Sequence, residues 1–132
     1  TMFLHGEDYR LKTLLSATNE ATFELVADEL RQIRDLALAD GTRLIVLLQP
    51  AKEEVYKESE SAILPDATVG LRGRLEQLGI EYIDAAPTFR TLAQQGTSLY
   101  SPTDGHPNAA GYAIFATLVA EYLETGENQS AN

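Results

Sequence analysis

The sequence reads LYSPTDGHPNAAGY from Leu99 to Tyr112, where a loop runs into the start of a helix. Pro107 has a fixed backbone φ that suits the first turn of a helix, so we expect the last helix to begin there. Apolar residues then recur at helical spacing up to Leu123. The spacing therefore predicts that Asp104 and His106 lie in a loop just ahead of a helix N-terminus.

A carboxylate and an imidazole stand two residues apart in this loop, at Asp104 and His106. Such a pair can transfer protons, because the carboxylate orients the imidazole and stabilises its charged form. A turn with a proline on each side and one glycine inside fixes where the two side chains point. The alternative interpretation is that Asp104 caps the following helix and that His106 is a surface residue.

The residues before the loop alternate between helical and strand patterns. A helix is expected from Thr18 or Asn19 to the stop at Gly41, because apolar residues repeat along one of its faces. That face holds Phe23, Val26, Leu30, Ile33 and Ala37, and Arg31, Arg34 and Asp35 fall largely away from it. The unbroken apolar run Leu44–Leu48 follows, and it is typical of a central parallel strand with both faces buried.

The later residues continue this alternation. They predict a polar helix over 51–59, a linker with Pro65 and Gly70, a helix over Val69–Leu78, a strand over Glu81–Asp84 and a short helix from Pro87 to near Gly96. Residues 1–17 show no clear period. The fold class is therefore expected to be α/β, a three-layer αβα arrangement with a small parallel sheet and ligands at the carboxyl ends of the strands. We expect one domain over 1–126, which is either whole or incomplete, and a polar tail over 127–132.

Composition excludes several functions. The 132 residues include 10 basic and 20 acidic ones, and the net charge of -10 repels nucleic acids and anionic lipid surfaces as partners. With no cysteine and two histidines, the chain offers neither thiolate chemistry nor a multi-histidine metal centre, and we expect no cofactor. Neither a membrane span nor a signal peptide is recognisable, so the compartment stays open between cytoplasmic and extracytoplasmic.

Two motifs resemble blocks of a known family. Residues Asp104–Tyr112, DGHPNAAGY, resemble the C-terminal block of the SGNH/GDSL hydrolase superfamily. The Asp-x-His spacing and residues Pro50–Tyr56, PAKEEVY, are similar to the branch that contains the alginate O-acetyltransferase-like proteins. The resemblance implies an SGNH fold, which is flavodoxin-like, and an ester or an acylated carbohydrate as substrate. It also implies that His106 acts as the base of a Ser-His-Asp triad and that Asp104 orients the imidazole.

The family's nucleophilic serine has no recognisable counterpart in this sequence. SGNH hydrolases carry it in a Gly-Asp-Ser block, and a glycine and an asparagine of middle blocks form the oxyanion hole; neither feature is found here. Ser101 is nearest to the pair in sequence, but it would have to fold back onto His106, so we interpret it as a turn former. The resemblance thus implies the Asp-His half of a triad, with the serine supplied by a completing segment or a partner chain.

Lys52 and Asn108 are the candidate substrate-binding residues. The charge of Lys52 suits an anionic substrate group near the strand end, whereas the alternative is a solvated ion pair with Glu53 or Glu54. Asn108 occupies a family position by resemblance, and we expect it to fix the first turn of the last helix.

Structural roles are expected for three other residues. Asp84 is expected to cap the helix that begins near Pro87. Tyr56 is expected to pack beside Lys52 with its hydroxyl at the surface. Gly111 indicates a close approach of the last helix to its neighbour.

Two further hypotheses stay open. A catalytically inactive interaction module would cover its exposed sheet edge by homodimerising, because two recognisable strands are few for a sheet. A small flavodoxin-like binder without enzymatic ancestry would require Asp104 and His106 to lie apart or to point away from any cleft.

Overall fold

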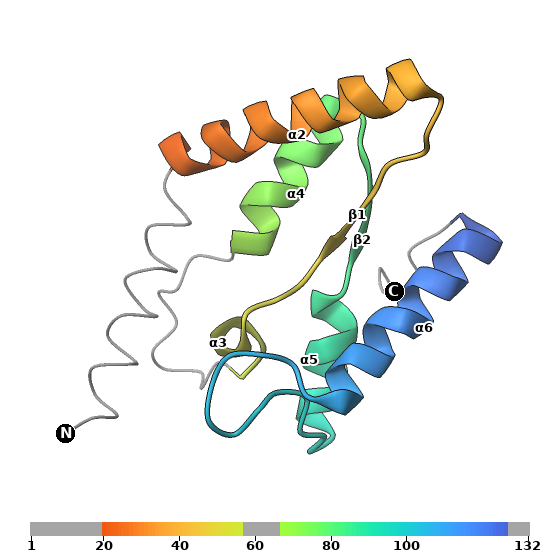
Figure 1. Ribbon diagram of the computed structural model, residues 1–132. Coiled ribbons are helices and arrows are strands. Elements are labelled where there is room, and N and C mark those ends of the chain that lie inside the picture. Colours follow the sequence, from red (N-terminus) through yellow and green to blue (C-terminus); the bar gives the residue numbers. More distant parts are fainter. Residues whose placement is uncertain (1–19, 57–66, 127–132) are drawn as a thin grey trace. The chain divides into compact units, whose positions relative to one another are not determined.

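The computed structural model describes residues 20–56 and 67–126 (Figure 1). Its elements are α2 (Glu20–Asp40), β1 (Ile45–Leu48), α3 (Lys52–Val55), α4 (Ala67–Leu78), β2 (Glu81–Asp84), α5 (Ala86–Gln94) and α6 (Ala109–Thr125). The described residues fall into two compact units, the first over 20–44 and 67–80 and the second over 45–56 and 81–126. The predictions made for residues 1–17, for the helix beyond 56, for the linker at Pro65 and for the tail over 127–132 lie outside the described residues.

The first unit packs α2 against α4 (Figure 1). The ring of Phe23 on α2 lies so close to Gly70 on α4 that an added Cβ would stand 2.5 Å from it. Arg74 of α4 forms ion pairs with Glu20 and with Glu24, the latter at 2.9 Å. Gly70 therefore belongs to the helix, where the absence of a side chain makes room for an aromatic ring.

The inward face of α2 differs from the predicted one at two places. Ala27 is buried whereas Val26 is 37% exposed, and Arg34 is half-buried whereas Ile33 is 48% exposed. Arg34 Nη1 donates a hydrogen bond of 2.8 Å to the carbonyl oxygen of Leu78. An arginine can bury its stem while its guanidinium binds a carbonyl, and hydrophobic spacing does not detect this role.

The second unit is built on two parallel strands, with Ile45 opposite Glu81 and Leu48 opposite Asp84. Within the described residues the sheet consists of β1 and β2. Both predicted strands are confirmed, and the protein has a mixed α/β fold with a small parallel sheet packed by helices. The full burial expected of β1 is not found, because Leu48 is buried and the three preceding residues are half-buried.

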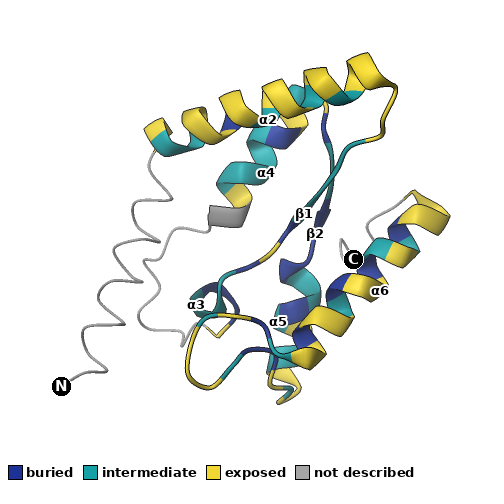
Figure 2. Ribbon diagram, in the orientation of Figure 1, coloured by how far each residue is buried: buried dark blue, intermediate teal, exposed yellow. Residues whose placement is uncertain are grey.

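The core of the second unit lies where α5 and α6 meet the sheet (Figure 2). Its buried residues are Val55, Ile83, Ala85, Phe89, Leu99, Tyr100, Phe115, Leu118 and Tyr122. Phe89 of α5 and Phe115 of α6 stack with their ring centroids 5.0 Å apart. Because Leu99 and Tyr100 belong to this core, the chain just before the Asp104 loop is firmly anchored.

Side chains determine where α5 and α6 begin. The buried carboxylate of Asp84 accepts a hydrogen bond of 2.9 Å from the backbone N–H of Ala86, the first residue of α5, while the N-cap position itself is Ala85, one residue later than predicted. The last helix begins at Ala109 rather than at Pro107, because Asn108 is the N-cap and Pro107 forms an antiparallel bridge with Tyr100.

None of the helices described here is long and apolar enough to cross a membrane.

Candidate active site

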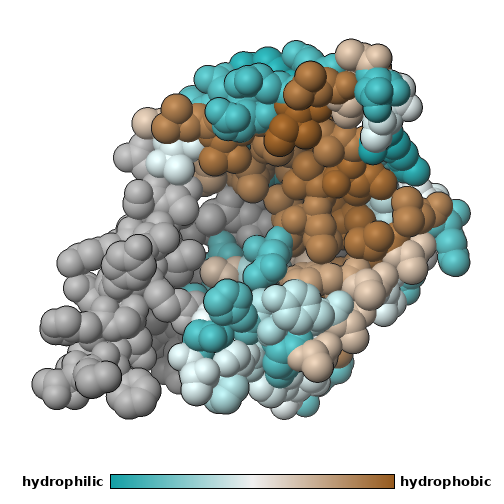
Figure 3. Space-filling view, in the orientation of Figure 1, coloured by the Kyte–Doolittle hydropathy of each residue, from teal (hydrophilic) through white to brown (hydrophobic). Residues whose placement is uncertain are grey.

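The loop that carries Asp104 and His106 is closed at its neck by backbone hydrogen bonds. Ser101 donates to the carbonyl oxygen of His106 at 2.8 Å, and Asn108 donates to that of Leu99 at 2.9 Å. The bridge between Tyr100 and Pro107 lies between these two bonds. Residues 101–106 therefore form a closed loop on an anchored base, and hydrophilic side chains cover this part of the surface in Figure 3.

Asp104 and His106 face each other inside this loop. The imidazole Nδ1 of His106 lies 3.2 Å from Oδ1 of Asp104, and the same oxygen accepts the backbone N–H of His106 at 2.8 Å. The side chains are 53% exposed for Asp104 and 79% exposed for His106. Because Nδ1 faces the carboxylate, Nε2 on the other side of the ring is directed away from it and can accept a proton. The flavodoxin-like hypothesis required the two residues to lie apart or to point away from any cleft; they lie together, but neither is among the residues that line the cavity beside the loop, so this hypothesis stays open.

The environment of Asp104 favours its anionic form. The backbone N–H of His106 is the largest cause that holds the pKa of this carboxyl below its usual value, and the imidazole and the Ser101 hydroxyl act in the same direction. Asp104 does not cap α6, because Asn108 has that role. Its hydrogen bonds instead orient the histidine two residues later.

Asn108 and Gly111 join the loop to α6. The side-chain oxygen of Asn108 accepts the backbone N–H of Gly111 at 3.0 Å, and its Nδ2 donates to the carbonyl oxygen of Ser98 at 2.9 Å. A Cβ on Gly111 would lie 2.5 Å from the carbonyl oxygen of Leu99 and 2.9 Å from Cβ of Pro107. Gly111 is thus the point of close approach that was predicted, and its neighbour is the neck of the loop rather than another helix.

Lys52 reaches the loop from α3. Its Nζ donates to the carbonyl oxygen of Ser101 at 2.8 Å and to that of Asp104 at 3.4 Å. Contact with an anionic substrate stays a prediction, because the bonds of this ammonium group that the structure shows go to the protein's own backbone.

Two tyrosines also join residues 50–56 to the segment just before the loop. The hydroxyl of Tyr56 donates to the carbonyl oxygen of Thr97 at 3.0 Å and accepts the N–H of Leu99 at 3.1 Å. Tyr56 is exposed, as predicted, and these two hydrogen bonds are additional to that surface position. The buried Tyr100 donates its hydroxyl to the carbonyl oxygen of Pro50 at 2.7 Å. Sequence reasoning missed both links because their partners are far apart in the chain and follow no periodic spacing.

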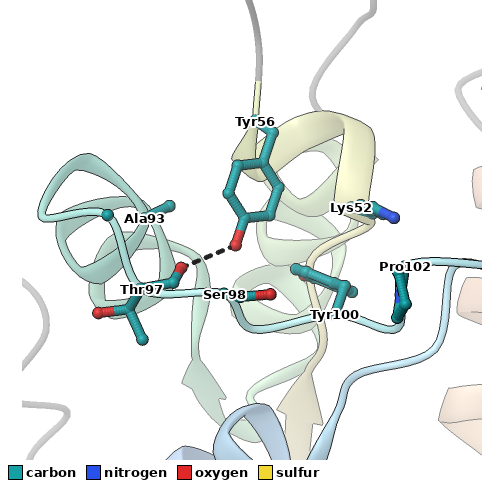
Figure 4. A pocket seen from close by; sticks show the side chains of 8 residues that line it. Lys52, Tyr56, Ala93, Thr97, Ser98, Tyr100 and Pro102 are labelled. Carbon is teal, nitrogen blue, oxygen red and sulfur yellow. Dashed lines mark hydrogen bonds between the residues drawn. The ribbon is translucent and has the colours of Figure 1, made fainter.

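A cavity of about 280 Å³ opens beside the loop (Figure 4). It is lined by Lys52, Tyr56, Ala93, Gly96, Thr97, Ser98, Tyr100 and Pro102. Lys52 also bonds to the backbone of Asp104, so this cavity borders the candidate site. The lining combines one cation, several hydroxyl groups and the rings of two tyrosines, which suits a small ligand with both polar and apolar surfaces.

The described serines do not complete a triad. Ser98 and Ser101 are the serines in this part of the chain, and neither is hydrogen-bonded to the imidazole of His106. The Ser101 hydroxyl lies 3.0 Å from that of Thr103 and accepts the Thr103 N–H at 3.3 Å. Ser101 therefore acts within the turn, as expected from its position.

Comparison with known proteins places the whole chain in one family. Residues 2–132 match the family described as the SGNH hydrolase-like domain of the acetyltransferase AlgX. No curated protein matches the sequence, and no solved structure does.

Proposed function

Because the chain belongs to the family of SGNH hydrolase-like domains of the acetyltransferase AlgX, we propose that it supplies the acid–base half of an ester-hydrolysing or O-acyl-transferring site. The observation that carries this proposal is the 3.2 Å contact between Nδ1 of His106 and Oδ1 of Asp104, with Nε2 left open. In this proposal His106 is the general base, Asp104 orients it, and the serine comes from a completing segment or a partner chain.

The reaction follows the chemistry of a Ser-His-Asp triad. The serine oxygen attacks the ester carbonyl while Nε2 of His106 takes the serine proton, and the imidazolium then protonates the leaving alcohol. Water or a sugar hydroxyl next attacks the acyl-serine, again giving its proton to Nε2, and the serine leaves with that proton. Asp104 stabilises the imidazolium in both steps. Its lowered pKa supports this role, because the contacts with His106 favour the anionic carboxylate.

The cavity beside the loop is the proposed place for the substrate. Its hydroxyl groups and tyrosine rings suit an acylated sugar, which is also the substrate class that the family suggests. Lys52 and Asn108 stay proposals as substrate-binding residues. Asn108 already uses its oxygen to cap α6 and its Nδ2 to bind Ser98 and Tyr100, so its contacts favour a structural contribution.

The complete product of the gene, assayed on p-nitrophenyl acetate and on an acetylated oligosaccharide, tests the proposal. Asp104→Asn is expected to lower kcat by about 10⁴-fold, and His106→Ala by about 10⁶-fold, because loss of the base costs about as much as loss of the whole triad. Asp35→Asn makes the same chemical change on exposed α2 and is expected to leave kcat unchanged. Unchanged turnover in the His106 and Asp104 variants would refute the proposed roles.

The 132-residue chain should be assayed alone in parallel. We expect it to be close to inert, because loss of the serine alone costs about as much as loss of the whole triad. Turnover that disappears in His106→Ala would show that the nucleophile lies within these residues and would overturn the half-site assignment.

One observation favours a second candidate, the inactive interaction module. Within the described residues the sheet consists of β1 and β2, and β1 has one edge with no described strand beside it. Proteins usually cover such edges, and pairing with a second copy is one way to do so. The mass of the chain in solution tests this candidate.

A further inference from the structure

The geometry points to Lys52 as a positioning residue that holds the Asp104 loop in its working orientation; this inference rests on the proposed function. Its Nζ bonds at 2.8 Å to the carbonyl oxygen of Ser101, where the loop begins, and at 3.4 Å to that of Asp104. One ammonium group therefore bridges both sides of the loop tip formed by Pro102 and Thr103.

The bonds within the tip, from Thr103 to Ser101 and from His106 to Asp104, are local and do not tie it to the core. Pro102, Thr103, Asp104 and His106 are exposed, and the backbone bond from Ser101 to His106 fixes only the neck. An exposed loop with few buried contacts opens at low free-energy cost. Hydrogen bonds from a charged donor are stronger than neutral ones, so Lys52 can reduce this opening substantially.

Lys52 itself stands on a fixed base. It is the first residue of α3, whose buried Glu54 accepts the backbone N–H of Ala51 at 2.6 Å and whose Val55 packs in the core. The hydroxyl of buried Tyr100 binds the carbonyl oxygen of Pro50, immediately before this turn. Lys52 thus ties the loop to residues that the core already holds in place.

Tyr56 makes the matching connection at the other end of α3. Its hydroxyl holds Thr97 and Leu99, which lie upstream of the loop, as Figure 4 shows for Thr97. Residues 50–56 therefore bind the approach to the loop through Tyr56 and the loop itself through Lys52. This arrangement accounts for the Lys and Tyr of the PAKEEVY segment by their hydrogen bonds to the candidate site.

Amide hydrogen exchange on the 132-residue chain tests the positioning role without relying on activity. In Lys52→Met we expect the His106 amide, which donates to Asp104, to exchange about fivefold faster or more. Arg31→Met removes one cation from α2 and is the control, with no change expected at His106. If the exchange rate of the His106 amide rises by less than about fivefold in Lys52→Met, the inference is overturned.

Kinetics of the complete gene product separate positioning from substrate binding. We expect Lys52→Met to lower kcat by about tenfold or more with KM changed less than about twofold, since orientation of the base matters in the transition state. Lys52→Arg keeps the charge and should recover part of kcat. If the Met variant folds poorly, the kinetic test is made with Lys52→Arg instead. A higher KM with unchanged kcat would make Lys52 a substrate-binding residue and refute positioning. Failure of His106→Ala to lower kcat would refute the proposed function while leaving the exchange result intact.

Discussion

At the scale of single residues, the candidate site depends on the contact between Asp104 and His106, which are two positions apart in the chain. Oδ1 of Asp104 accepts the backbone N–H of His106 and lies 3.2 Å from the imidazole Nδ1, so the carboxylate positions the ring of the proposed base. The DGHPN motif made this pair recognisable, because the two residues are close in sequence. The roles of Tyr56, Tyr100 and Lys52 could not be predicted, because they depend on hydrogen bonds to distant backbone carbonyls that any residue type could provide.

Acid should loosen the loop through Asp104. Its carboxyl pKa is lower in the folded protein than its usual value, so the stabilising contribution is present above the usual value and is lost as the pH falls through the lowered one. We expect the His106 amide to lose protection only in that acid range. Amide exchange measured across a pH series checks this, with Asp104→Asn showing no corresponding step. A step of the same size in Asp104→Asn would contradict the assignment.

At the scale of helices and strands, periodicity predicted each element of the described residues but not each face or start. β1 follows from an apolar run, and β2 follows from its place between the helix that stops at Gly79 and the next helix. On α2 the inward positions include Arg34, whose burial depends on the carbonyl of Leu78. The start of α6 shifted because Asn108 caps more effectively than Pro107 can, and Pro107 was free to pair with Tyr100.

Two helical glycines offer a matched test of the junction between the loop and α6. A Cβ at Gly111 would lie 2.5 Å from the backbone oxygen of Leu99, so Gly111→Ala should lower the free energy of unfolding by about 1–3 kcal/mol. Gly73 on α4 has nothing within 4 Å of the added Cβ, so Gly73→Ala should raise it by up to about 1 kcal/mol. Urea denaturation of both variants measures these changes. Equal effects at the two positions would contradict the close approach at Gly111.

At the scale of the whole molecule, the expectation of a single domain over 1–126 stays a prediction. The described residues form two compact units, each assembled from segments that are separated in sequence. The α/β class was predictable because alternating periods of helix and strand are a local property of the sequence. Division into units depends on contacts between distant segments, which spacing along the chain does not reveal.

The interaction-module candidate makes a prediction about mass. If a sheet edge pairs with a second copy, the chain should have twice its mass of 14.4 kDa in solution. Association should strengthen with added salt, because salt screens the repulsion between two molecules that each carry a net charge of -10. Light scattering over a range of salt and protein concentrations checks this. A mass of one chain under all these conditions would count against the candidate.

The connection between α3 and the loop uses main-chain oxygens as acceptors, those of Pro50, Thr97, Ser101 and Asp104. Side chains at Thr97 and Ser98, which line the cavity, can therefore diversify without removing an acceptor from this connection. Natural drift or directed evolution could alter what the neighbouring cavity accepts while the histidine keeps its orientation, so selectivity and catalytic geometry are separately adjustable in this fold.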